Sequence, residues 1–369
     1  MKLSGSVQSL DSNVQSNIKR SNISTEQILD LSLRASEIGA NSYSELILAL
    51  PGETLESHLS SLGSLVDSGF NTISMYQLMM LPGTEMGSEE TRLRFGMLTK
   101  YRVVPRCFGR YSFRGKHFVV AEIEEICVST NTLSYNDYLN ARKMHFIVNI
   151  FYNDGLFRPQ ISILRQLGLS VWDFLLEIFQ DTQNSKFSEL VESYLMESEQ
   201  ELFESQESLS KFMHAKGNLE RYIAGELGSN LIFKYKSLGL TEFIDEVFDF
   251  ACEALLGYVR KASRVDEKSL DIIAVSFDLR KAQVKNFYTC QSAQLEASFL
   301  IPDIDNIILS EIQSSSSRQK VTYELTFDQA KESDIAGLVQ LFGSDATGLS
   351  RVLSRINSAS MYRNIAVVS

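Results

Sequence analysis

The chain has 369 residues, which is enough for two domains or one large domain with a sizeable core. Its 44% hydrophobic and 22% charged residues are typical of a globular protein, and its formal net charge of -11 argues against nucleic acid or an anionic membrane surface as the main partner. No apolar run reaches the roughly 18 residues that span a bilayer, and polar residues follow Met1 where a signal peptide would be apolar. We therefore expect a cytoplasmic protein with neither a membrane nor a nucleic-acid partner.

The first hundred residues alternate between strand-like and helix-like segments. A short strand is expected from Leu3 to Ser9, and Ser24 is expected to open a helix because Gln27, three positions on, completes a capping box. That helix should end at Gly39. Its expected apolar face consists of Ile28, Leu31, Ala35 and Ile38.

The next two strand-like segments both end at a Pro-Gly pair. In "YSELILALPGET", the apolar run from Leu46 to Leu50 predicts a strand buried on both faces of a parallel sheet, ended by Pro51 and Gly52. A helix with apolar residues at positions 55, 59, 62 and 65 follows, and "NTISMYQLMMLPGT" then gives a further strand and a second Pro-Gly corner. Strand, helix, strand, helix, strand with short connections predicts parallel strands joined by helical crossovers.

From about residue 103 the composition changes, and we expect three domains with boundaries at 1–105, 106–312 and 313–369. A strand from Phe118 to Thr130 leads into a mainly helical and aromatic region, and the serines at 314–317 predict a flexible connection before the strand "KVTYELTF". Further helices are expected at Phe187 to Leu209, Asn218 to Tyr235, Thr241 to Val259 and Asp328 to Phe342.

Three stretches of the N-terminal region resemble, in order, the second half of the radical S-adenosylmethionine (SAM) core barrel: "SGSVQSLDSNVQSNIKRSN", "ELILALPGETLESHL" and "ISMYQLMMLPGTEM". The most similar subgroup carries a cobalamin-binding domain before the barrel, and its elongator-type, methylthiotransferase and coproporphyrinogen-dehydrogenase relatives are similar too. Gln8 and Arg20 lie twelve positions apart, and Glu45 lies twenty-five beyond Arg20, as similar polar residues do in this family. The resemblance covers about a quarter to a third of the chain. It implies an α/β fold in which a partial, half TIM-type barrel is followed by a mainly α-helical C-terminal region.

The resemblance implies a SAM site at the carboxyl ends of these strands, where the loops of a parallel barrel form the binding face. Arg20 would offer a fork of donors to a carboxylate. Each residue also has a structural explanation: Gln8 and Ser9 could end a strand and cap a helix, Arg20 could lie at a helix end, and Glu53 and Thr54 could be helix N-terminal residues. The expected cofactor-binding residues are Gln8, Ser9, Arg20, Glu45, Pro51, Gly52, Tyr76 and Pro82.

The family's chemistry needs a [4Fe-4S] cluster held by three cysteines in CxxxCxxC, and this chain has no such spacing. Its four well-separated cysteines are typical of reduced structural thiols, and its four histidines form no HExxH, so no metal site is expected. Those cysteines are Cys107, Cys127, Cys252 and Cys290.

We therefore expect the C-terminal portion of a radical SAM enzyme, inactive alone. The full-length protein would cleave SAM reductively to a 5'-deoxyadenosyl radical with the help of a [4Fe-4S] cluster, and cobalamin is the further cofactor that the subgroup implies. The partner would be a missing N-terminal half or a separate chain, and the substrate is not indicated. The alternative is a non-catalytic, degenerate half-barrel that serves as a partner or scaffold. A nucleotide-binding α/β domain is disfavoured because no GxGxxG or Walker loop follows a strand.

Overall fold

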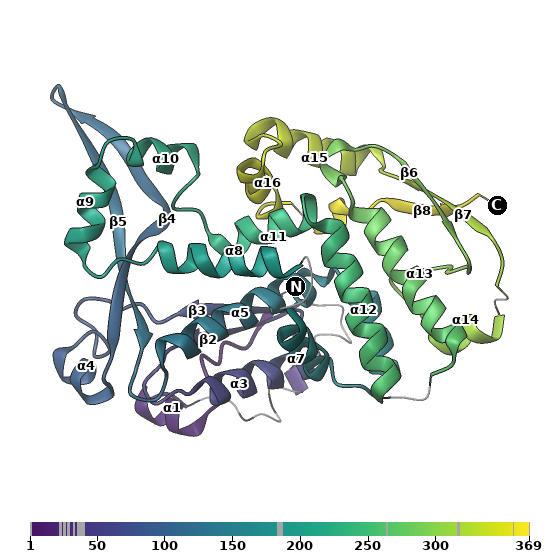
Figure 1. The fold of residues 1–369 in the computed structure, drawn as a ribbon, viewed down its shortest axis with the longest axis horizontal. Coiled ribbons are helices and arrows are strands. Elements are labelled where there is room, and N and C mark those ends of the chain that lie inside the picture. Colours follow the sequence, from purple (N-terminus) through teal and green to yellow (C-terminus); the bar gives the residue numbers. More distant parts are fainter. Residues whose placement is uncertain are drawn as a thin grey trace. The chain divides into compact units, whose positions relative to one another are not determined.

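The computed structural model describes residues 2–21, 24, 27, 30, 31, 34, 41–182, 187–262, 265–315, 318–356 and 358–368. They belong to two compact units (Figure 1): Met1–His145 with Ser193–Leu231 form unit 1, and Phe146–Glu192 with Ile232–Ser369 form unit 2. The chain passes between the units within α5 (Tyr135–Phe151), within α8 (Phe187–Gln200) and at the start of α11 (Leu231–Thr241). The expected boundaries at 105 and 312 remain predictions.

Unit 1 begins with the predicted alternation of strands and helices. Its remaining elements are β1 (Lys2–Ser4), α1 (Ser12–Asn17), β2 (Asn41–Leu48), α3 (Leu55–Asp67), β3 (Thr72–Gln77), α4 (Glu89–Phe95), β4 (Leu98–Phe113), β5 (Lys116–Ser129), α9 (Gln206–His214) and α10 (Asn218–Ala224).

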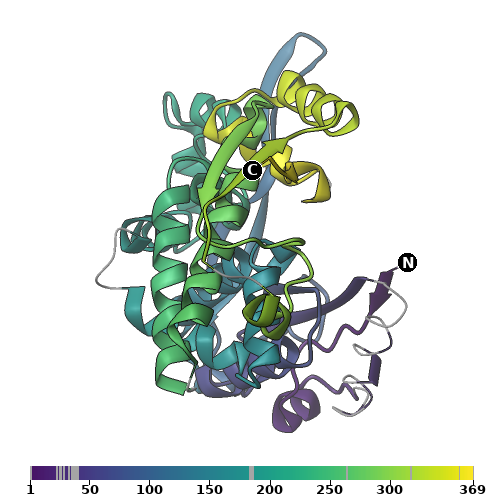
Figure 2. The ribbon, with the colours of Figure 1, turned by 90° about the vertical axis from the view of Figure 1, so that its right-hand side faces the viewer.

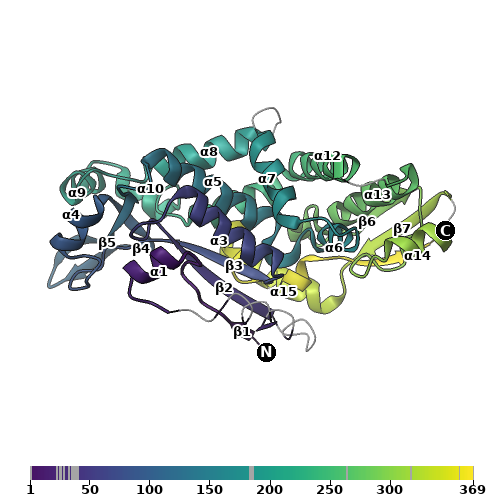
Figure 3. The ribbon, with the colours of Figure 1, turned by 90° about the horizontal axis from the view of Figure 1, so that it is seen from below.

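The strands β1, β2 and β3 form a parallel sheet in chain order, as predicted. Glu45 pairs with Ser74 in this sheet, and Gln8, beyond the end of β1, forms an isolated bridge with Leu46. Figure 3 shows α3 covering one face of β2 and β3. After β3 the chain forms an isolated antiparallel bridge with β5, in which the backbone N–H of Met80 donates to the carbonyl of Glu125 at 2.8 Å. The described chain therefore has a mixed α/β architecture.

The strand predicted at Leu46 to Leu50 overlaps the end of β2, and all of its residues except Ile47 are buried, so its burial on both faces is incomplete. Burial alternates along β2 itself, so that Ser44, Leu46 and Leu48 are buried while Tyr43 and Ile47 are partly exposed. A parallel strand with one accessible face is unusual, because helical crossovers normally cover both faces of such a sheet. We call the less buried face of β2, which carries Tyr43, Glu45 and Ile47, the open face.

Expectations for residues 22–40 can be followed only in part. Ser24 and Gln27 make the reciprocal capping bonds, in which the Ser24 N–H donates to Gln27 Oε1 at 2.9 Å and the Gln27 N–H to Ser24 Oγ at 3.2 Å. The capping box is thereby confirmed. Of the residues expected to form or end the helix, Ile28, Ala35, Ile38 and Gly39 lie outside the described residues.

A long antiparallel hairpin, β4 and β5, follows the parallel sheet. The strand expected at Phe118 to Thr130 is confirmed by β5, whereas β4 was not anticipated. The hairpin turns at Arg114 and Gly115, whose φ angles of 48° and 74° suit a two-residue turn. Its register shifts between Val103 and Phe108, where Arg106 has a φ of 66°.

Unit 2 is mainly helical and ends in a small antiparallel sheet of order β6, β7, β8 (Figure 2). Its strand β7 and helix α15 confirm the segments expected at "KVTYELTF" and Asp328 to Phe342, and Asp328 caps α15. The flexible connection expected at 314–317 does not begin at Ser314, because Ser314 and Ser315 are the last two residues of α14. The elements are η1 (Asn153–Gly155), α6 (Arg158–Gln166), α7 (Val171–Asp181), α12 (Ile244–Ala262), α13 (Glu267–Val284), η3 (Phe287–Thr289), β6 (Ala293–Ala297), α14 (Leu309–Ser315), β7 (Val321–Thr326), α15 (Gln329–Phe342), α16 (Ala346–Leu353), η4 (Ser358–Met361) and β8 (Asn364–Val367).

Phenylalanine rings from several helices form much of the core of unit 2. The ring centroids of Phe151 and Phe187 are 5.3 Å apart, those of Phe187 and Phe250 are 5.1 Å apart, and those of Phe157 and Phe248 are 4.9 Å apart. Such spacings are favourable for aromatic pairs. In the part of the chain that the structure describes, no helix combines the length and the apolar character needed to cross a membrane.

Candidate functional site

The open face of the parallel sheet presents a cluster of polar side chains around Glu45. Alternation along β2 places Tyr43 and Glu45 on this face, and Tyr76 of β3, which pairs with Ile47, lies on the same face. Ser6 follows β1, and its hydroxyl donates to Glu45 Oε2 at 2.6 Å. Tyr76 is 49% exposed, so solvent or a ligand can reach the cluster.

The hydrogen bonds of the cluster favour an ionised Glu45. Tyr43 donates its phenolic proton to Glu45 Oε1, and the hydroxyl oxygens of Tyr43 and Tyr76 lie 3.2 Å apart. Bonds from Ser6 and Tyr43, with the charge of Arg20 adding to them, lower the pKa of Glu45. Burial, followed by the bond to Glu45, raises the pKa of Tyr43. At neutral pH the face therefore presents the Glu45 carboxylate beside the neutral phenol of Tyr43.

Arg20 and Gln8 border this cluster. The Arg20 guanidinium donates from Nη2 to the carbonyl of Ser6 at 2.7 Å. Ser6 is also the residue whose hydroxyl donates to Glu45. The backbone of Gln8 bonds to β2 on both sides of Leu46: its N–H donates to the Glu45 carbonyl, and its carbonyl accepts from the Ile47 N–H, both at 2.9 Å. The predicted residues Gln8, Arg20, Glu45 and Tyr76 thus lie close together.

The structure does not bring the other predicted residues into this cluster. Ser9 is fully buried, and its hydroxyl accepts from the Asp11 N–H at 3.2 Å. Asp11, not Ser9, caps α1. Pro51 is buried, and its carbonyl accepts from Asn17 Nδ2 at 3.0 Å. Ligand contacts by Ser9 and Pro51 would therefore require these residues to move.

The two Pro-Gly corners differ in their surroundings. Gly52 has a φ of 82°, and a Cβ atom at this position would lie 2.5 Å from Asn17 Nδ2. Gly83 has a similar φ of 79°, but a Cβ atom there would have no neighbour within 4 Å. Pro82 and Gly83 are both exposed. The first corner is therefore a packed part of the fold, and the second is a surface turn.

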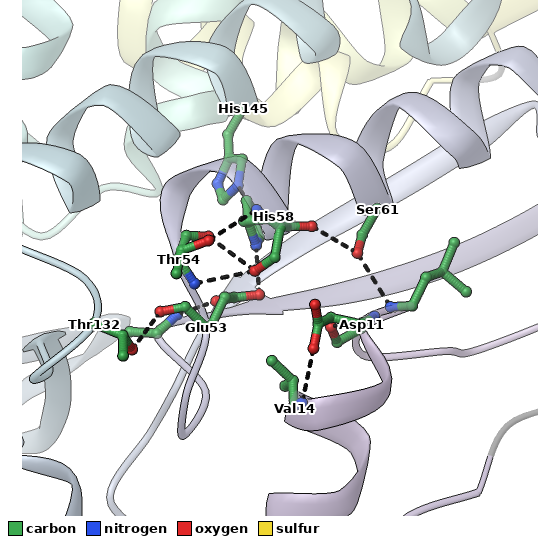
Figure 4. A network of polar contacts seen from close by, with 12 residues as sticks. Asp11, Val14, Glu53, Thr54, His58, Ser61, Thr132 and His145 are labelled. Carbon is green, nitrogen blue, oxygen red and sulfur yellow. Dashed lines mark hydrogen bonds and ion pairs between the residues drawn. The ribbon is translucent and has the colours of Figure 1, made fainter.

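Figure 4 shows a buried network of polar side chains behind the first Pro-Gly corner, which was not predicted from the sequence. Glu53 Oε1 lies 2.9 Å from His58 Nδ1, and His58 Nε2 lies 2.7 Å from His145 Nε2. Glu53 Oε2 accepts from the Ala49 N–H at 2.7 Å, and Ala49 has the left-handed φ of 69°. Thr54 caps α3 in a capping box with Ser57, as the structural explanation of Thr54 expected.

This network is structural. The side chains of Glu53, His58 and His145 are fully buried, so solvent does not reach them. If His58 donates from Nδ1 to Glu53, its Nε2 is free to accept a proton from His145 Nε2, which requires no positive charge on either ring. Burial above all, with the charges of His58 and Arg142, lowers the pKa of His145 well below its usual value. The network joins the end of β2 to α3 and α5.

The described residues do not fit an iron–sulfur cluster. No group of three or more His, Cys, Asp or Glu side chains in the described ranges is arranged to hold a metal ion. Cys127 is buried, and burial raises the pKa of its thiol to about 12, which disfavours the thiolate that iron binds. The other cysteines, Cys107, Cys252 and Cys290, are free thiols as well.

Comparison with known proteins gives two distant matches to part of the chain. No protein-family model matches the chain. The chain is 30% identical over 164 residues to the cobalamin-dependent radical SAM methyltransferase TokK of Streptomyces tokunonensis, and 28% identical over 162 residues to 2-(S-pantetheinyl)-carbapenam-3-carboxylate methyltransferase of Streptantibioticus cattleyicolor. Each match covers 44% of this chain and 23% of the relative. The matched part thus amounts to about a quarter of each relative's length, and the similarity supports a distant relationship to radical SAM methyltransferases.

Proposed function

We propose that the chain is the C-terminal portion of a cobalamin-dependent radical SAM methyltransferase, and that the open face of β1, β2 and β3 binds SAM in the full-length protein. The observation that carries the proposal is the polar cluster around Glu45 on parallel strands in chain order. Neighbouring strands of a TIM-type barrel have this order. The similarity to TokK supports both the family and methyl transfer as the reaction class.

The side chains of the cluster suit the amino-acid end of SAM, which carries an ammonium and a carboxylate. Glu45, held ionised by its hydrogen bonds, would accept from the ammonium. Arg20 would donate to the carboxylate, and the exposed hydroxyl of Tyr76 would bind either polar group. SAM, when bound, supplies the group that is transferred or the radical that starts the reaction.

The described residues do not fit a [4Fe-4S] cluster, so the iron–sulfur chemistry requires residues other than these. We therefore propose that the cluster is held by an N-terminal half or a partner chain, and that this chain alone does not cleave SAM. Cobalamin enters the proposal through the relative's name, and we assign it no residue. Anaerobic reconstitution with iron and sulfide should give 5'-deoxyadenosine at the rate of a protein-free control, and a higher rate would contradict the proposal.

Equilibrium dialysis of the whole chain against radiolabelled SAM tests the binding site. We expect weak binding that falls at least tenfold in Glu45→Gln, because the ammonium loses its charged acceptor. Glu85→Gln is the matched control, since Glu85 is exposed and pairs with Lys19 at 2.6 Å. Equal binding by both variants, or no binding by the unaltered chain at millimolar SAM, would contradict a SAM site at Glu45.

A non-catalytic half-barrel that completes a barrel with another chain is the second candidate. It is favoured by the combination of an accessible polar sheet face with described residues that do not fit a cluster. Under this function the open face would bind protein, so SAM should not alter the unfolding temperature of the chain. A SAM-dependent rise in that temperature would exclude this candidate.

A further inference from the structure

The outer part of the β4–β5 hairpin has one strongly apolar face. Cross-strand pairing of Tyr111 with Phe118, and of Gly109 with Val120, places Tyr111, Phe113, Phe118 and Val120 on the same side of the ribbon. These four residues, here named the apolar ribbon face, are 53%, 63%, 45% and 43% exposed, in that order. The rings of Tyr111 and Phe118 stack with their centroids 6.0 Å apart.

The opposite side of the same ribbon already has a partner within unit 1. Phe108 packs edge-on against Tyr222 of α10, with ring centroids 5.2 Å apart, and Arg110 Nη2 lies 2.7 Å from Glu220 Oε1. Figure 1 shows the tip of the hairpin extending past α9 and α10. A two-stranded ribbon is marginally stable by itself, and exposed apolar patches of this kind mark interaction surfaces. The apolar ribbon face is therefore a candidate interface.

The charges on this face are arranged so that the face complements itself. Lys116 lies at the tip with Arg114, whose guanidinium carbon is 5.2 Å from the centroid of the Phe113 ring, so the tip end is positive. Glu122 lies six residues beyond Lys116 along β5, on the same side as Phe118 and Val120. Turning a second ribbon by 180° brings the Lys116 end of each copy to the Glu122 end of the other. The aromatic residues then meet in the middle. Both Lys116 and Glu122 are exposed.

We propose that the apolar ribbon face binds the same face of a second copy of this chain, with the two ribbons antiparallel and Lys116 of each copy opposite Glu122 of the other. An isologous contact of this kind closes on itself and produces a dimer rather than a filament. Three half-exposed rings supply roughly 300 Å² per copy, which belongs to the weak class of interfaces. The dimer should therefore be reversible and depend on concentration. The proposal does not depend on SAM binding.

Sedimentation equilibrium of the whole chain at several concentrations tests the association. We expect a monomer–dimer equilibrium whose dissociation constant rises at least tenfold in Phe118→Thr, a change that keeps a strand-forming residue. Leu93→Gln is the matched control, because Leu93 is 77% exposed on α4 of the same unit and should leave the constant unchanged. A chain that stays monomeric throughout, or a dimer that Phe118→Thr does not weaken, would overturn the proposal.

Charge exchange tests the antiparallel arrangement. Lys116→Glu alone and Glu122→Lys alone should each weaken the dimer several-fold, because each places like charges opposite one another. The double variant should recover the original constant to within about threefold, since the pairs are restored with reversed sign. Recovery also shows that the two substitutions together are compatible with folding. Failure of the double variant to recover would overturn the proposed pairing, and self-association unaffected by all three variants would exclude this face as the interface.

Discussion

At the scale of single residues, the carboxylate of Glu45 determines the electrostatics of the open face. We predict that Glu45→Gln lowers the pKa of Tyr43 towards its ordinary value of about 10, because the anion that accepts the phenolic proton is lost while burial remains. Titration of tyrosine Cζ chemical shifts measures this, with Tyr43→Phe assigning the resonance. Glu85→Gln should have no effect. An unchanged Tyr43 titration in Glu45→Gln would show that the bond to Glu45 does not raise the pKa of Tyr43.

His145 makes the stability of the protein depend on pH. Its pKa is well below 6.5 in the folded chain, so below about pH 6.5 the unfolded chain binds more protons, and the free energy of unfolding falls as the pH falls. Above that pH the contribution is fully present. Urea unfolding between pH 7.5 and 5.5 should show a decrease of up to about 1.4 kcal/mol per pH unit from this group.

The pH dependence should be smaller in His145→Gln, whose amide can still bond to His58 but does not titrate. His117→Gln is the matched control, because His117 is exposed at the tip of the hairpin. A pH dependence that is equal in the two variants would show that His145 is not its source.

At the scale of elements, the two Pro-Gly corners provide a matched comparison. Gly52→Ala should destabilise the chain by about 2 kcal/mol or more, because it adds a clash with Asn17 to the cost of a left-handed φ. Gly83→Ala has the same backbone cost without a clash, so roughly 1 kcal/mol is expected. Chemical denaturation measures both. Equal losses would mean that Asn17 moves aside at little cost.

The alternation of β1 to β3 with helices was predictable, because apolar runs, capping residues and Pro-Gly pairs are local signals. Strand β4 was not, since Pro105, Gly109 and several basic residues interrupt its pattern, and a register shift follows Val103. Arg114 and Gly115, the turn between β4 and β5, were the signal that could have predicted the hairpin.

Part of the candidate site could be predicted from the spacing of its polar residues along the sequence. Arg20 and Glu45 were identified in this way, whereas Tyr43 could have been found from the alternation along β2. Ser6 follows β1, and its bond to Glu45 became apparent only in the structure. The contact of His58 with His145 joins residues 87 positions apart, and no local pattern indicates it. Local physics therefore predicts elements and their ends, and pairings between distant elements need the structure.

At the scale of the whole molecule, the two units should respond separately to local damage. Each has its own core, and the candidate SAM site, the buried histidines and the hairpin all belong to unit 1. Multi-domain chains often depart from two-state unfolding for this reason. A variant that weakens unit 2 is therefore expected to leave the parallel sheet of unit 1 protected.

Arg363 is the position in unit 2 best suited to test this. It is 3% exposed, its Nη1 donates to the carbonyls of Ala282 at 3.0 Å and Lys285 at 2.8 Å, and its guanidinium lies over the ring of Phe327. Arg363→Ala leaves buried carbonyls without donors and should cost about 3 kcal/mol. Arg318→Ala, which removes an exposed pair with Asp271, should cost less than about 1 kcal/mol.

Hydrogen exchange shows which elements are destabilised by Arg363→Ala. In Arg363→Ala the amides of β7, β8 and the end of α13 should exchange faster by about two orders of magnitude, which corresponds to 3 kcal/mol, because opening of unit 2 becomes easier. The amides of β2 and β3 should exchange as in the unaltered chain, since their hydrogen bonds lie within unit 1. Equal acceleration in both sheets would show instead that the units open together, and the parallel sheet would then owe its stability to the C-terminal part of the chain.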